Sequence, residues 1–384
     1  MGRRVLVKAV LVVLIVAAGA ALYVLDRPGA MPDGLAGLLA PPTTEVAIGR
    51  GNVSARAGWY ELHFTDPKYP DDPRSHRGGL DERLVNLMDR ARRTLDVADY
   101  DFDLANVADA MVRAKQRGVR VRMVTDTDTL ANTKDERIQS AFRRLREAGI
   151  PVVDDRRPAI MHNKLTVVDG EYVSTGSWNY TDGDTYRQNN WMGVFRSPEL
   201  AANYTAEFEQ MFAGRFGPAK AKTLPHPEVI VDGARIRTCF SPKGGCADLI
   251  VDTIGREASQ SLYFMAFSFT HDGIGKAVVD KQKAGVSVVG VFESTGSQTP
   301  FSEYGTMKSA GLEVYTDGNP WAMHHKVIIV DGRLVIAGSF NFSANADKDN
   351  DENLLIIEDG DIASAFKAEF DRVLQQAKRA SAKP

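Results

Sequence analysis

The residues best suited to chemistry in this chain lie in two short segments that resemble each other. The first is IMHNKLTVVDGEYVSTGSWN, residues 160–179, and the second is AMHHKVIIVDGRLVIAGSFN, residues 322–341. In both, His-x-Lys is followed after four residues by Asp, and after six more by Gly-Ser-x-Asn. Histidine can act as a nucleophile or an acid near neutral pH, while Lys, Ser and Asn supply positive charge and hydrogen-bond donors. Such a set could cleave an anionic phosphodiester.

Each segment is predicted to form a β-hairpin. Asp-Gly at residues 169–170 and 331–332 lies between two β-forming runs, which is a strong signal for a two-residue turn. If Val168 faces Glu171, then His162 lies opposite Ser177, and the alternation of side chains along a strand brings the polar residues to one face. The residues predicted to share that face are His162, Lys164, Ser177 and Asn179, and in the second hairpin His324, Lys326, Ser339 and Asn341.

Three other polar residues of these segments are explained without catalysis. Asp169 and Asp331 occupy the predicted turns, so we expect a structural role for both. His325 matches Asn163 of the first hairpin and is predicted to point away from the polar face, so we assign it no catalytic role.

The rest of the chain indicates a duplicated α/β fold. The runs LDVADYDF (95–102) and LYFMAFSF (262–269) each follow one helical pattern and precede another, and the strand-like runs VRVRMVTD and VSVVGVFE come next. Alternating strands and helices predict a mixed sheet flanked by helices in each half. We expect a first half at residues 59–220, a joint at 221–234 and a second half at 235–384, packed as a pseudo-twofold pair with the active site between them.

The N-terminal residues 1–25 differ from the rest of the chain. Arg3, Arg4 and Lys8 precede an uncharged run from Ala9 to Leu25, which is long enough to span a bilayer. This predicts a membrane anchor at residues 9–25, with the catalytic part outside the cytoplasm (periplasmic or extracellular) and a Pro-, Gly- and Ala-rich linker at residues 26–58. The alternatives are a signal peptide cleaved near Ala20, which would release a secreted protein, and a buried core helix.

The two cysteines, Cys239 and Cys246, leave two interpretations open. In an oxidising compartment they could form a disulfide, and otherwise they would be free, partly buried thiols. We find no convincing metal-ligand pattern in the sequence.

The duplicated pattern resembles the signature of the phospholipase D superfamily, and the resemblance extends from about Trp59 to the C-terminus. The second half, with CFSPKGGC near its start, is most similar to the branch of bacterial nucleases and mitochondrial cardiolipin hydrolases. The resemblance implies one site within a single chain, in which one histidine becomes a phosphohistidine, the other protonates the leaving group, and water resolves the intermediate. It implies no metal and no cofactor. The lysines and asparagines at 164, 326, 179 and 341 would complete the catalytic set, and Ser177 and Ser339 would bind substrate.

The two copies differ at one position that matters for the histidines. In the nuclease branch, a Glu eleven residues after the motif Asn orients the catalytic histidine. Glu352 occupies that place after Asn341, whereas Asn190 occupies it after Asn179. Because a carboxylate stabilises a charged imidazole better than an amide does, we expect His324, backed by Glu352, to be the more basic histidine. The resemblance then implies that His162 attacks phosphorus and His324 donates the proton.

Two substrate classes follow from these observations. A membrane tether, together with a net charge of −3 that provides no basic field for nucleic acid, favours a membrane phospholipid. The resemblance of the second half to nucleases makes DNA or RNA the alternative. A phosphatidyl transferase of the cardiolipin synthase type is less favoured, because only one hydrophobic segment is present. An inactive membrane-anchored binding protein is also less favoured, because both His-Lys pairs are present.

Overall fold

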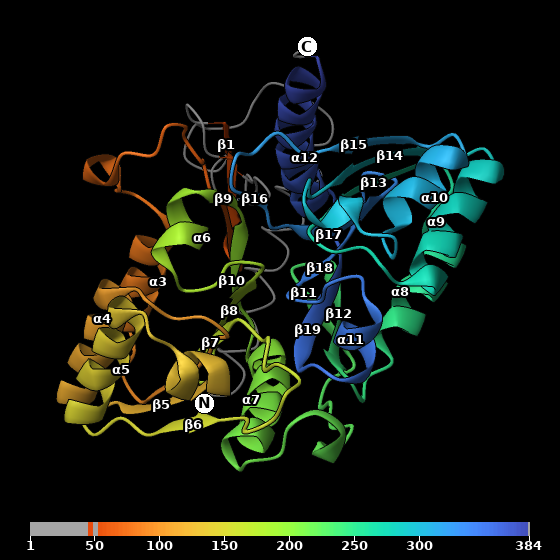
Figure 1. Cartoon of the computed structure of the whole chain (residues 1–384). Coiled ribbons are helices and arrows are strands. Elements are labelled where there is room, and N and C mark those ends of the chain that lie inside the picture. Colours follow the sequence, from red (N-terminus) through yellow and green to blue (C-terminus); the bar gives the residue numbers. More distant parts are fainter. Residues whose placement is uncertain (1–44, 49–52, 383–384) are drawn as a thin grey trace, which may run out of the picture. The chain divides into compact units, whose positions relative to one another are not determined.

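Two mixed β-sheets, one in each half of the chain, organise the structure (Figure 1). The computed structural model describes residues 45–48 and 53–382, and the predicted anchor at residues 9–25 lies outside them. Within the described residues, one sheet has nine strands in the order β1-β2-β3-β10-β8-β7-β4-β5-β6, and the other has eight in the order β11-β12-β19-β18-β17-β13-β14-β15. The order from β3 to β6 matches that from β12 to β15 strand for strand, which confirms the predicted duplication.

The elements of the first half alternate as the sequence predicts. Its strands are β1 (Glu45–Ile48), β2 (Val53–Ala57), β3 (Tyr60–Phe64), β4 (Thr94–Ala98), β5 (Arg120–Thr125), β6 (Val152–Asp154), β7 (Leu165–Val168), β8 (Tyr172–Gly176), β9 (Gln188–Asn189) and β10 (Trp191–Arg196). Its helices are α3 (Leu80–Asp89), α4 (Ala105–Gln116), α5 (Glu136–Glu147), α6 (Asp182–Tyr186) and α7 (Pro198–Phe212).

The second half repeats the same succession. Its strands are β11 (Glu228–Val231), β12 (Ala234–Ser241), β13 (Ser261–Ala266), β14 (Ser287–Phe292), β15 (Glu313–Thr316), β16 (Ala322–Met323), β17 (Lys326–Val330), β18 (Leu334–Gly338) and β19 (Glu352–Glu358). Its helices are α8 (Cys246–Glu257), α9 (Asp272–Lys283), α10 (Glu303–Ser309), α11 (Ala344–Lys348) and α12 (Gly360–Ser381).

Local sequence explains where the longest helices begin. Ser197 and Asp359 precede α7 and α12, and their side chains accept hydrogen bonds from the backbone N–H groups of Leu200 and Ile362. Such caps satisfy donors that the first helical turn leaves without partners. The central strands β17 and β18 read KVIIV and LVIAG and are buried along their whole length, as expected for strands covered on both faces.

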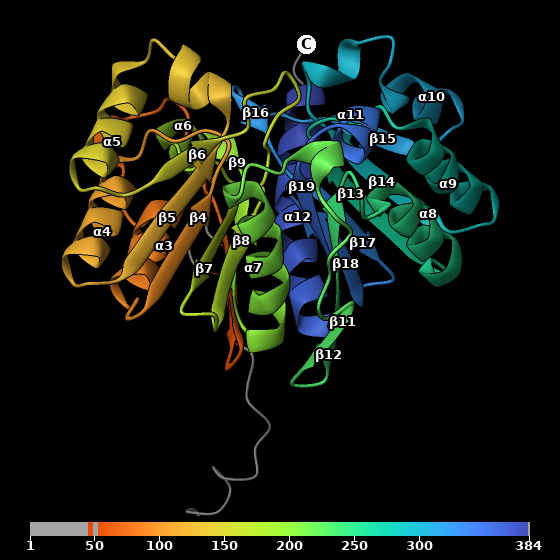
Figure 2. The same ribbon diagram turned by 90° about the horizontal axis from the view of Figure 1, so that it is seen from below.

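Helices cover both faces of each sheet (Figure 2). In this view α3, α4 and α5 lie outside the first sheet, α8 and α9 lie outside the second, and α7 and α12 lie between the two sheets. The two outer apolar clusters each draw on one half only, but the central cluster contains residues of both halves. Phe366 of α12 packs in this central cluster against Phe64 and Trp191 of the first half, with ring centroids 5.2 and 5.1 Å apart.

Both sheets extend into the ranges that the sequence assigns to connections. Strands β1 and β2 fall within the predicted linker 26–58, where β-forming residues follow the Pro-rich stretch, and they add two antiparallel strands beside β3. Strand β11 falls within the predicted joint 221–234 and pairs with β12. Within the part of the chain that the structure describes, no helix is long and apolar enough to cross a membrane.

Candidate active site

The turns of the two motif hairpins are held by their aspartates. Asp169 and Asp331 adopt φ angles of 56° and 50°, in the left-handed region that Asp and Gly tolerate in such turns. The Asp169 carboxylate accepts hydrogen bonds from the backbone N–H groups of residues 92, 93 and 94, and Asp331 does the same for residues 259, 260 and 261. Partial burial alone would raise the pKa of Asp169, but these donors outweigh it and lower the pKa. Both aspartates thus tie a turn to the start of a neighbouring strand.

The register of both hairpins differs by one residue from the prediction. Val168 pairs with Tyr172, not with Glu171, and the second hairpin is shifted in the same way. The Glu171 N–H closes the turn on the Val168 carbonyl at 3.0 Å, which leaves Glu171 as an extra, unpaired residue. The ladder between the two strands ends at the pair Leu165 and Thr175, so the polar motif residues lie beyond its regular part. Strand alternation therefore does not bring them together, and contacts between the halves do.

Two short backbone seams join the halves at the motif histidines. Strand β16, just before His324, pairs in parallel with β9 of the first half, and the His324 N–H donates to the Asn189 carbonyl at 2.9 Å. In the same way, Met161 pairs with Asp351, and the His162 N–H donates to the Asp351 carbonyl at 2.9 Å. Each motif histidine therefore lies against a segment of the opposite half. Its neighbour there is the residue that directly follows Asn189 or Asp351 in the chain.

Because of these contacts between the halves, each histidine has the partner that the sequence analysis assigns to the other histidine. His162 Nδ1 lies 2.8 Å from Glu352 Oε2, and His324 Nδ1 lies 2.9 Å from Asn190 Oδ1. The expectation that Glu352 backs His324 is therefore wrong: the carboxylate of the second half serves the histidine of the first. The cause is the crossing of backbone between halves, which the spacing of either motif alone does not reveal.

The motif serines hold these orienting residues. Ser177 Oγ donates to Asn190 Oδ1 at 2.8 Å, and Ser339 Oγ donates to Glu352 Oε2 at 2.7 Å. Both serines are completely buried. The resemblance implies that both serines bind substrate, whereas in the structure their hydroxyls hold the side chains behind the histidines.

The motif glycines allow this close approach. A Cβ atom on Gly176 would lie 2.1 Å from the Trp191 carbonyl oxygen, and one on Gly338 would lie 2.2 Å from the Asn353 carbonyl oxygen. Any larger residue would push the serine that follows away from strand β10 or β19.

The two lysines are buried beside the histidines. Lys164 Nζ donates to the His162 carbonyl and Lys326 Nζ donates to the His324 carbonyl, both at 2.8 Å. Each ammonium also lies over an aromatic ring: Lys164 is 5.2 Å from the centroid of Tyr100, and Lys326 is 4.6 Å from that of Phe267. The two lysines thus flank the pair of imidazoles; burial lowers the pKa of Lys164 and lowers that of Lys326 well below 10.5, and an anion between them would favour their charged forms.

Tyr100 and Phe267 also contact the histidines edge to face, with centroids 5.3 Å from His162 and 4.6 Å from His324. Sequence reasoning missed these aromatic residues. The signal was available, because each is the third residue from the end of the repeated runs LDVADYDF and LYFMAFSF.

The motif asparagines differ in their surroundings. The backbone N–H and Nδ2 of Asn179 both donate to Asp184 Oδ2 at 2.9 Å. The position equivalent to Asp184, five residues after Asn341, is Ala346. The Oδ1 atoms of Asn179 and Asn341 are buried without a hydrogen-bond partner among the described residues. A polar atom left in this state at a charged site suits contact with substrate or water.

Burial and charge shift the titration of the whole group. Burial lowers the pKa of His162 well below its usual 6.5, and Lys164 and Lys326 lower it further. The pKa of His324 is lowered well below 6.5 for the same reasons. Burial raises the pKa of Glu352 to about 8, although Lys164 and Ser339 oppose this. A phosphodiester anion between the lysines would offset their charge and raise the pKa of both histidines.

A buried ion network supports the seam at His162. The Asp351 carboxylate contacts Lys220 Nζ at 2.6 Å and is also paired with Arg157, while Lys220 is paired with Glu207. Burial raises the pKa of Glu207 to about 6 despite the charge of Lys220. Lys220 comes from the end of the first half, so the connection between the halves takes part in holding the active site.

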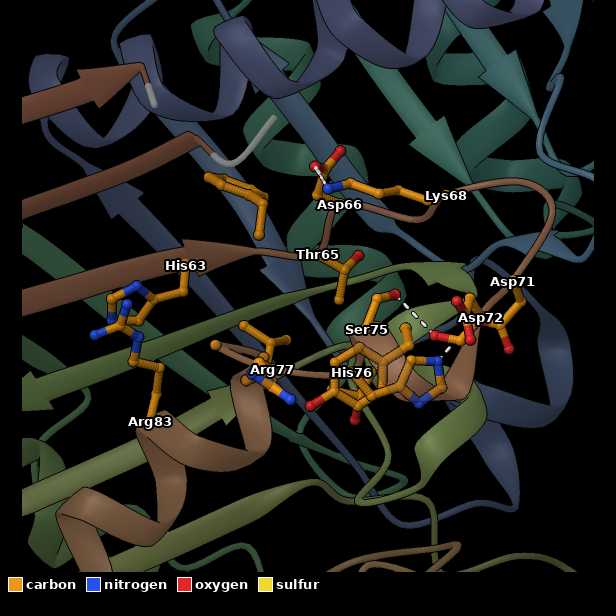
Figure 3. A pocket seen from close by; sticks show the side chains of 16 residues that line it. His63, Thr65, Asp66, Lys68, Asp71, Asp72, Ser75, His76, Arg77 and Arg83 are labelled. Atoms are coloured by element: carbon orange, nitrogen blue, oxygen red, sulfur yellow. Dashed lines mark hydrogen bonds and ion pairs between the residues drawn. The ribbon is translucent and has the colours of Figure 1, made fainter. Parts of the chain in front are cut away.

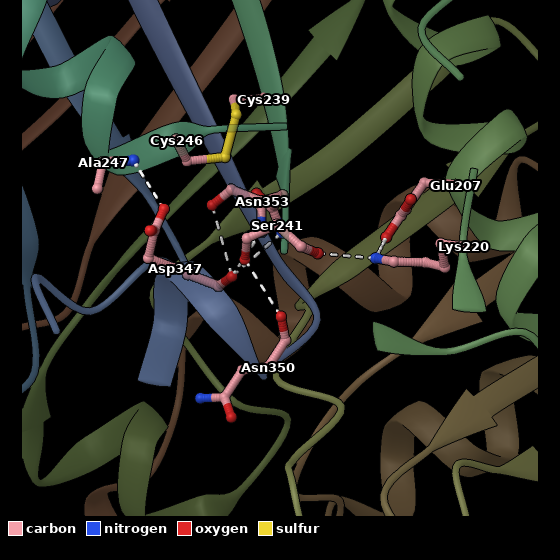
Figure 4. The surroundings of a disulfide bond; sticks show 10 residues. Glu207, Lys220, Cys239, Ser241, Cys246, Ala247, Asp347, Asn350 and Asn353 are labelled. Carbon is pink, nitrogen blue, oxygen red and sulfur yellow. Dashed lines mark hydrogen bonds and ion pairs between the residues drawn. A yellow bond between two sulfur atoms is a disulfide. The ribbon is translucent and has the colours of Figure 1, made fainter. Parts of the chain in front are cut away.

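A disulfide lies beside this network (Figure 4). Cys239 and Cys246 are bonded to each other, which decides between the two interpretations left open by the sequence. In the loop that they close, the Ser241 carbonyl accepts from Lys220 Nζ at 2.8 Å, and Ser241 Oγ donates to the Asn350 carbonyl at 3.2 Å. The disulfide loop therefore packs against the segment that leads to Glu352.

Across residues 45–48 and 53–382, no group of three or more His, Cys, Asp or Glu residues is arranged to hold a metal ion. What the geometry provides is two imidazoles with fixed Nδ1 atoms, two lysines and two asparagines at one junction. This arrangement can present the two Nε2 atoms to a single anionic group.

The family of the chain follows from this site and from a sequence match. The domain described as "Cardiolipin synthase, PLD-like domain" matches residues 84–212 and 250–374, ranges that include both hairpins. The chain belongs to the phospholipase D-like family.

Individual relatives agree with this family. The chain is 38% identical over 133 residues to a phospholipase D of Rickettsia bellii (strain RML369-C), covering 35% of this chain and 66% of the relative. It is 35% identical over 156 residues to a mitochondrial cardiolipin hydrolase of Xenopus tropicalis, covering 41% and 71%. The aligned parts thus span about two thirds of these relatives.

A solved structure resembles the whole fold. The phosphatidylserine synthase of Haemophilus influenzae Rd KW20 superimposes with a TM-score of 0.60 and 13% identity, over 90% of each chain. At this identity, the likeness concerns the fold alone.

Proposed function

We propose that this protein hydrolyses phosphodiester bonds by the phospholipase D reaction, at a single site built from both halves of the chain. The observation that carries the proposal is the reciprocal arrangement of the histidines, each held through Nδ1 by the opposite half. This hydrogen bond fixes the tautomer and places the reactive lone pair on Nε2. Lys164 and Lys326 supply the charge that an anionic substrate needs.

We assign attack on phosphorus to His162. Its Nε2 forms a P–N bond while the P–O bond to the leaving group breaks, and His324 Nε2–H protonates the departing alkoxide. The ring of His162 becomes positively charged in this step. That charge offsets the burial that raises the pKa of Glu352, so the ionised carboxylate on Nδ1 is favoured and stabilises the ring. His324 then takes a proton from water as the water attacks phosphorus and the P–N bond breaks, which restores both histidines.

We propose a membrane phospholipid as the substrate. The relatives named phospholipase D and mitochondrial cardiolipin hydrolase support this choice, and the net charge of −3 provides little attraction for nucleic acid. The predicted anchor at residues 9–25 would hold the catalytic part outside the cytoplasm, close to lipid head groups. Carbonate washing of membranes that contain the full chain tests the anchor: release into the wash, or an N-terminus near Ala20, would contradict it.

Turnover of defined diesters tests the proposal. The full chain is incubated with vesicles of phosphatidylglycerol or cardiolipin, and separately with single- and double-stranded DNA, all in EDTA. We expect lipid hydrolysis that EDTA does not abolish, because the nucleophile and the acid are both histidines. Loss of activity in EDTA would contradict the mechanism, DNA cleavage without lipid cleavage would contradict the substrate, and failure to cleave any diester would contradict the function.

Two variants test the roles of the histidines. With phosphatidyl-4-nitrophenol labelled in the phosphate, whose leaving group needs no proton, we expect His324→Ala to accumulate an acid-labile phosphoenzyme, because the intermediate is resolved slowly without its base. We expect His162→Ala to form none and to lose activity. The reverse pattern would exchange the two roles.

A further inference from the structure

A carboxylate, that of Asp184, lies near His324. It does not come from the position in the repeat that supplies Glu352 to His162. Asp184 Oδ2 lies 3.4 Å from His324 Nδ1, on the same side of the ring as the direct hydrogen bond to Asn190. Glu352 occupies the position equivalent to Asn190, and Ala346 occupies the position equivalent to Asp184. Each half therefore contributes one carboxylate to the histidine of the other half, from two different places in the repeat.

Local structure fixes the Asp184 side chain. Helix α6 begins after Thr181, whose Oγ1 accepts the Asp184 N–H at 3.1 Å. The backbone N–H and Nδ2 of Asn179 both donate to Asp184 Oδ2, and the residue is only 4% exposed. In the first half, the motif asparagine Asn179 thus holds the Asp184 carboxylate in place. In the second half, the equivalent position after Asn341 is Ala346, which has no carboxylate.

Other residues of helix α6 are held by His76, which Figure 3 shows among the residues that line a polar pocket. His76 stacks on Tyr186 with centroids 4.0 Å apart, and its Nδ1 lies 3.0 Å from Asp182 Oδ1. These contacts lie at a polar cavity of about 250 Å³ that none of the motif residues lines. A short helix held in this way can keep the carboxylate in one position while chemistry takes place at the histidine.

We propose that Asp184 is a positioning residue for His324, and that Asn190 and Asp184 together perform the task that Glu352 alone performs for His162. Asn190 fixes the tautomer through a neutral hydrogen bond, and Asp184 stabilises the positive charge of the ring. This inference rests on the proposed function, in which His324 protonates the leaving group.

The charges around His324 explain why a carboxylate is needed. Burial lowers the pKa of His324, and Lys326, Lys164, His162 and His325 lower it further. An ionised Asp184, 3.4 Å from Nδ1, would oppose them. Burial raises the pKa of Asp184 itself, although the hydrogen bonds from Asn179 and the charge of Lys164 counter this. Removal of this negative charge would lower the pKa of His324, so the acid form would be lost at a lower pH.

The leaving group distinguishes this role from a merely structural one. Asp184→Asn keeps the shape and an acceptor for Asn179 but removes the charge. With phosphatidylglycerol, whose leaving group is an alkoxide, we expect kcat to fall about 10- to 100-fold, a part of what general acid catalysis supplies. With phosphatidyl-4-nitrophenol, whose phenolate leaves without protonation, we expect the first-turnover rate of nitrophenol release to change by less than about threefold, because this step needs no acid. We also expect the alkaline limb of the pH profile to move to lower pH.

A double variant and a control complete the test. Asp184→Ala with Asn190→Glu builds the arrangement of the second half in the first, and we expect it to recover most of the activity on phosphatidylglycerol. Asp109→Asn removes a partly exposed carboxylate of the same half that is paired with Arg144, and it should leave the ratio of the two substrates unchanged. Melting temperatures establish that each variant is folded.

Equal losses on both substrates, no loss in Asp184→Asn, or failure of the double variant to recover activity would overturn the role of Asp184. If the wild-type protein cleaves neither substrate, the proposed function itself fails. That result is distinct from a wild-type protein that is active and an Asp184→Asn variant that matches it.

Discussion

At the residue scale, the site brings together two histidines that have different hydrogen-bond partners, at the junction between the two halves. The sequence predicts both histidines, both lysines and both asparagines, because the duplicated spacing makes a chance arrangement improbable. It does not predict that Glu352 serves His162, because a motif records distances along the chain and not which half its end will meet. The sequence does not predict the role of Asp184 either, although this residue is close to the motif. A single Asp at this point is explained equally well as one of the acidic residues common in the first turn of a helix.

Glu352→Gln tests the charge behind the nucleophile. The amide can still accept from His162 Nδ1 but cannot stabilise the charged ring, so we expect kcat on phosphatidylglycerol to fall about 100-fold or more with little change in KM. Rapid-quench measurement should place the loss in phosphoenzyme formation. Glu358→Gln, on the same strand, is the matched control, and a Glu352→Gln variant with wild-type kcat would contradict the role.

At the scale of elements, the contacts that hold the two halves together at the site involve segments that the sequence analysis treats as loops or as the joint between the halves. The sequence predicts the order of strands and helices, since hydrophobic periodicity and turn residues are local. It misplaces the hairpin register by one residue, because the extra residue at Glu171 is set by how the turn closes. It assigns no role to Lys220, whose importance comes from a buried pairing with Asp351 of the other half.

Lys220→Met tests this support. The change leaves Glu207 and Asp351 buried without their main cation, so we expect a loss of about 3–5 kcal/mol in the free energy of unfolding. Burial raises the folded-state pKa of Glu207 from 4.5 to about 6 in the wild-type protein, and loss of Lys220 raises it further. The destabilisation should therefore be small near pH 3.5, about one unit below the unfolded-state pKa, where the glutamate is protonated in both states, and should grow as pH rises.

Urea unfolding at pH 3.5 and pH 8 measures this effect. The double variant Glu207→Gln with Lys220→Met should recover part of the lost stability at pH 8. A loss that is independent of pH would contradict the charge argument.

At the scale of the whole molecule, the halves share one interior. The sequence predicts two similar units, yet their mutual burial is not visible in it, because an apolar helix face does not state which surface covers it. Phe366 of α12 illustrates this, since it packs on Phe64 and Trp191 of the other half. We therefore expect the two halves to unfold together and not as separate units.

Phe366→Ala tests this expectation. The residue is completely buried in the central cluster, and its truncation should cost about 3–5 kcal/mol. Far-UV circular dichroism and tryptophan fluorescence should report one coincident transition at a lower urea concentration. The exposed Phe301, changed to Ala, is the control. Two separate transitions in the wild-type protein would show that each half is stable alone.

Because both halves of the site belong to one chain, equivalent positions of the two copies can carry different residues. An assembly of two identical chains must carry the same residue at both symmetry-related places, so any change that suits the attacking histidine would be imposed on the proton donor as well. Once the copies are joined in one chain, each can change alone. The difference between Asn190 with Asp184 on one side and Glu352 with Ala346 on the other is of this kind. Joining both copies in one chain therefore allows the two sides of the site to differ.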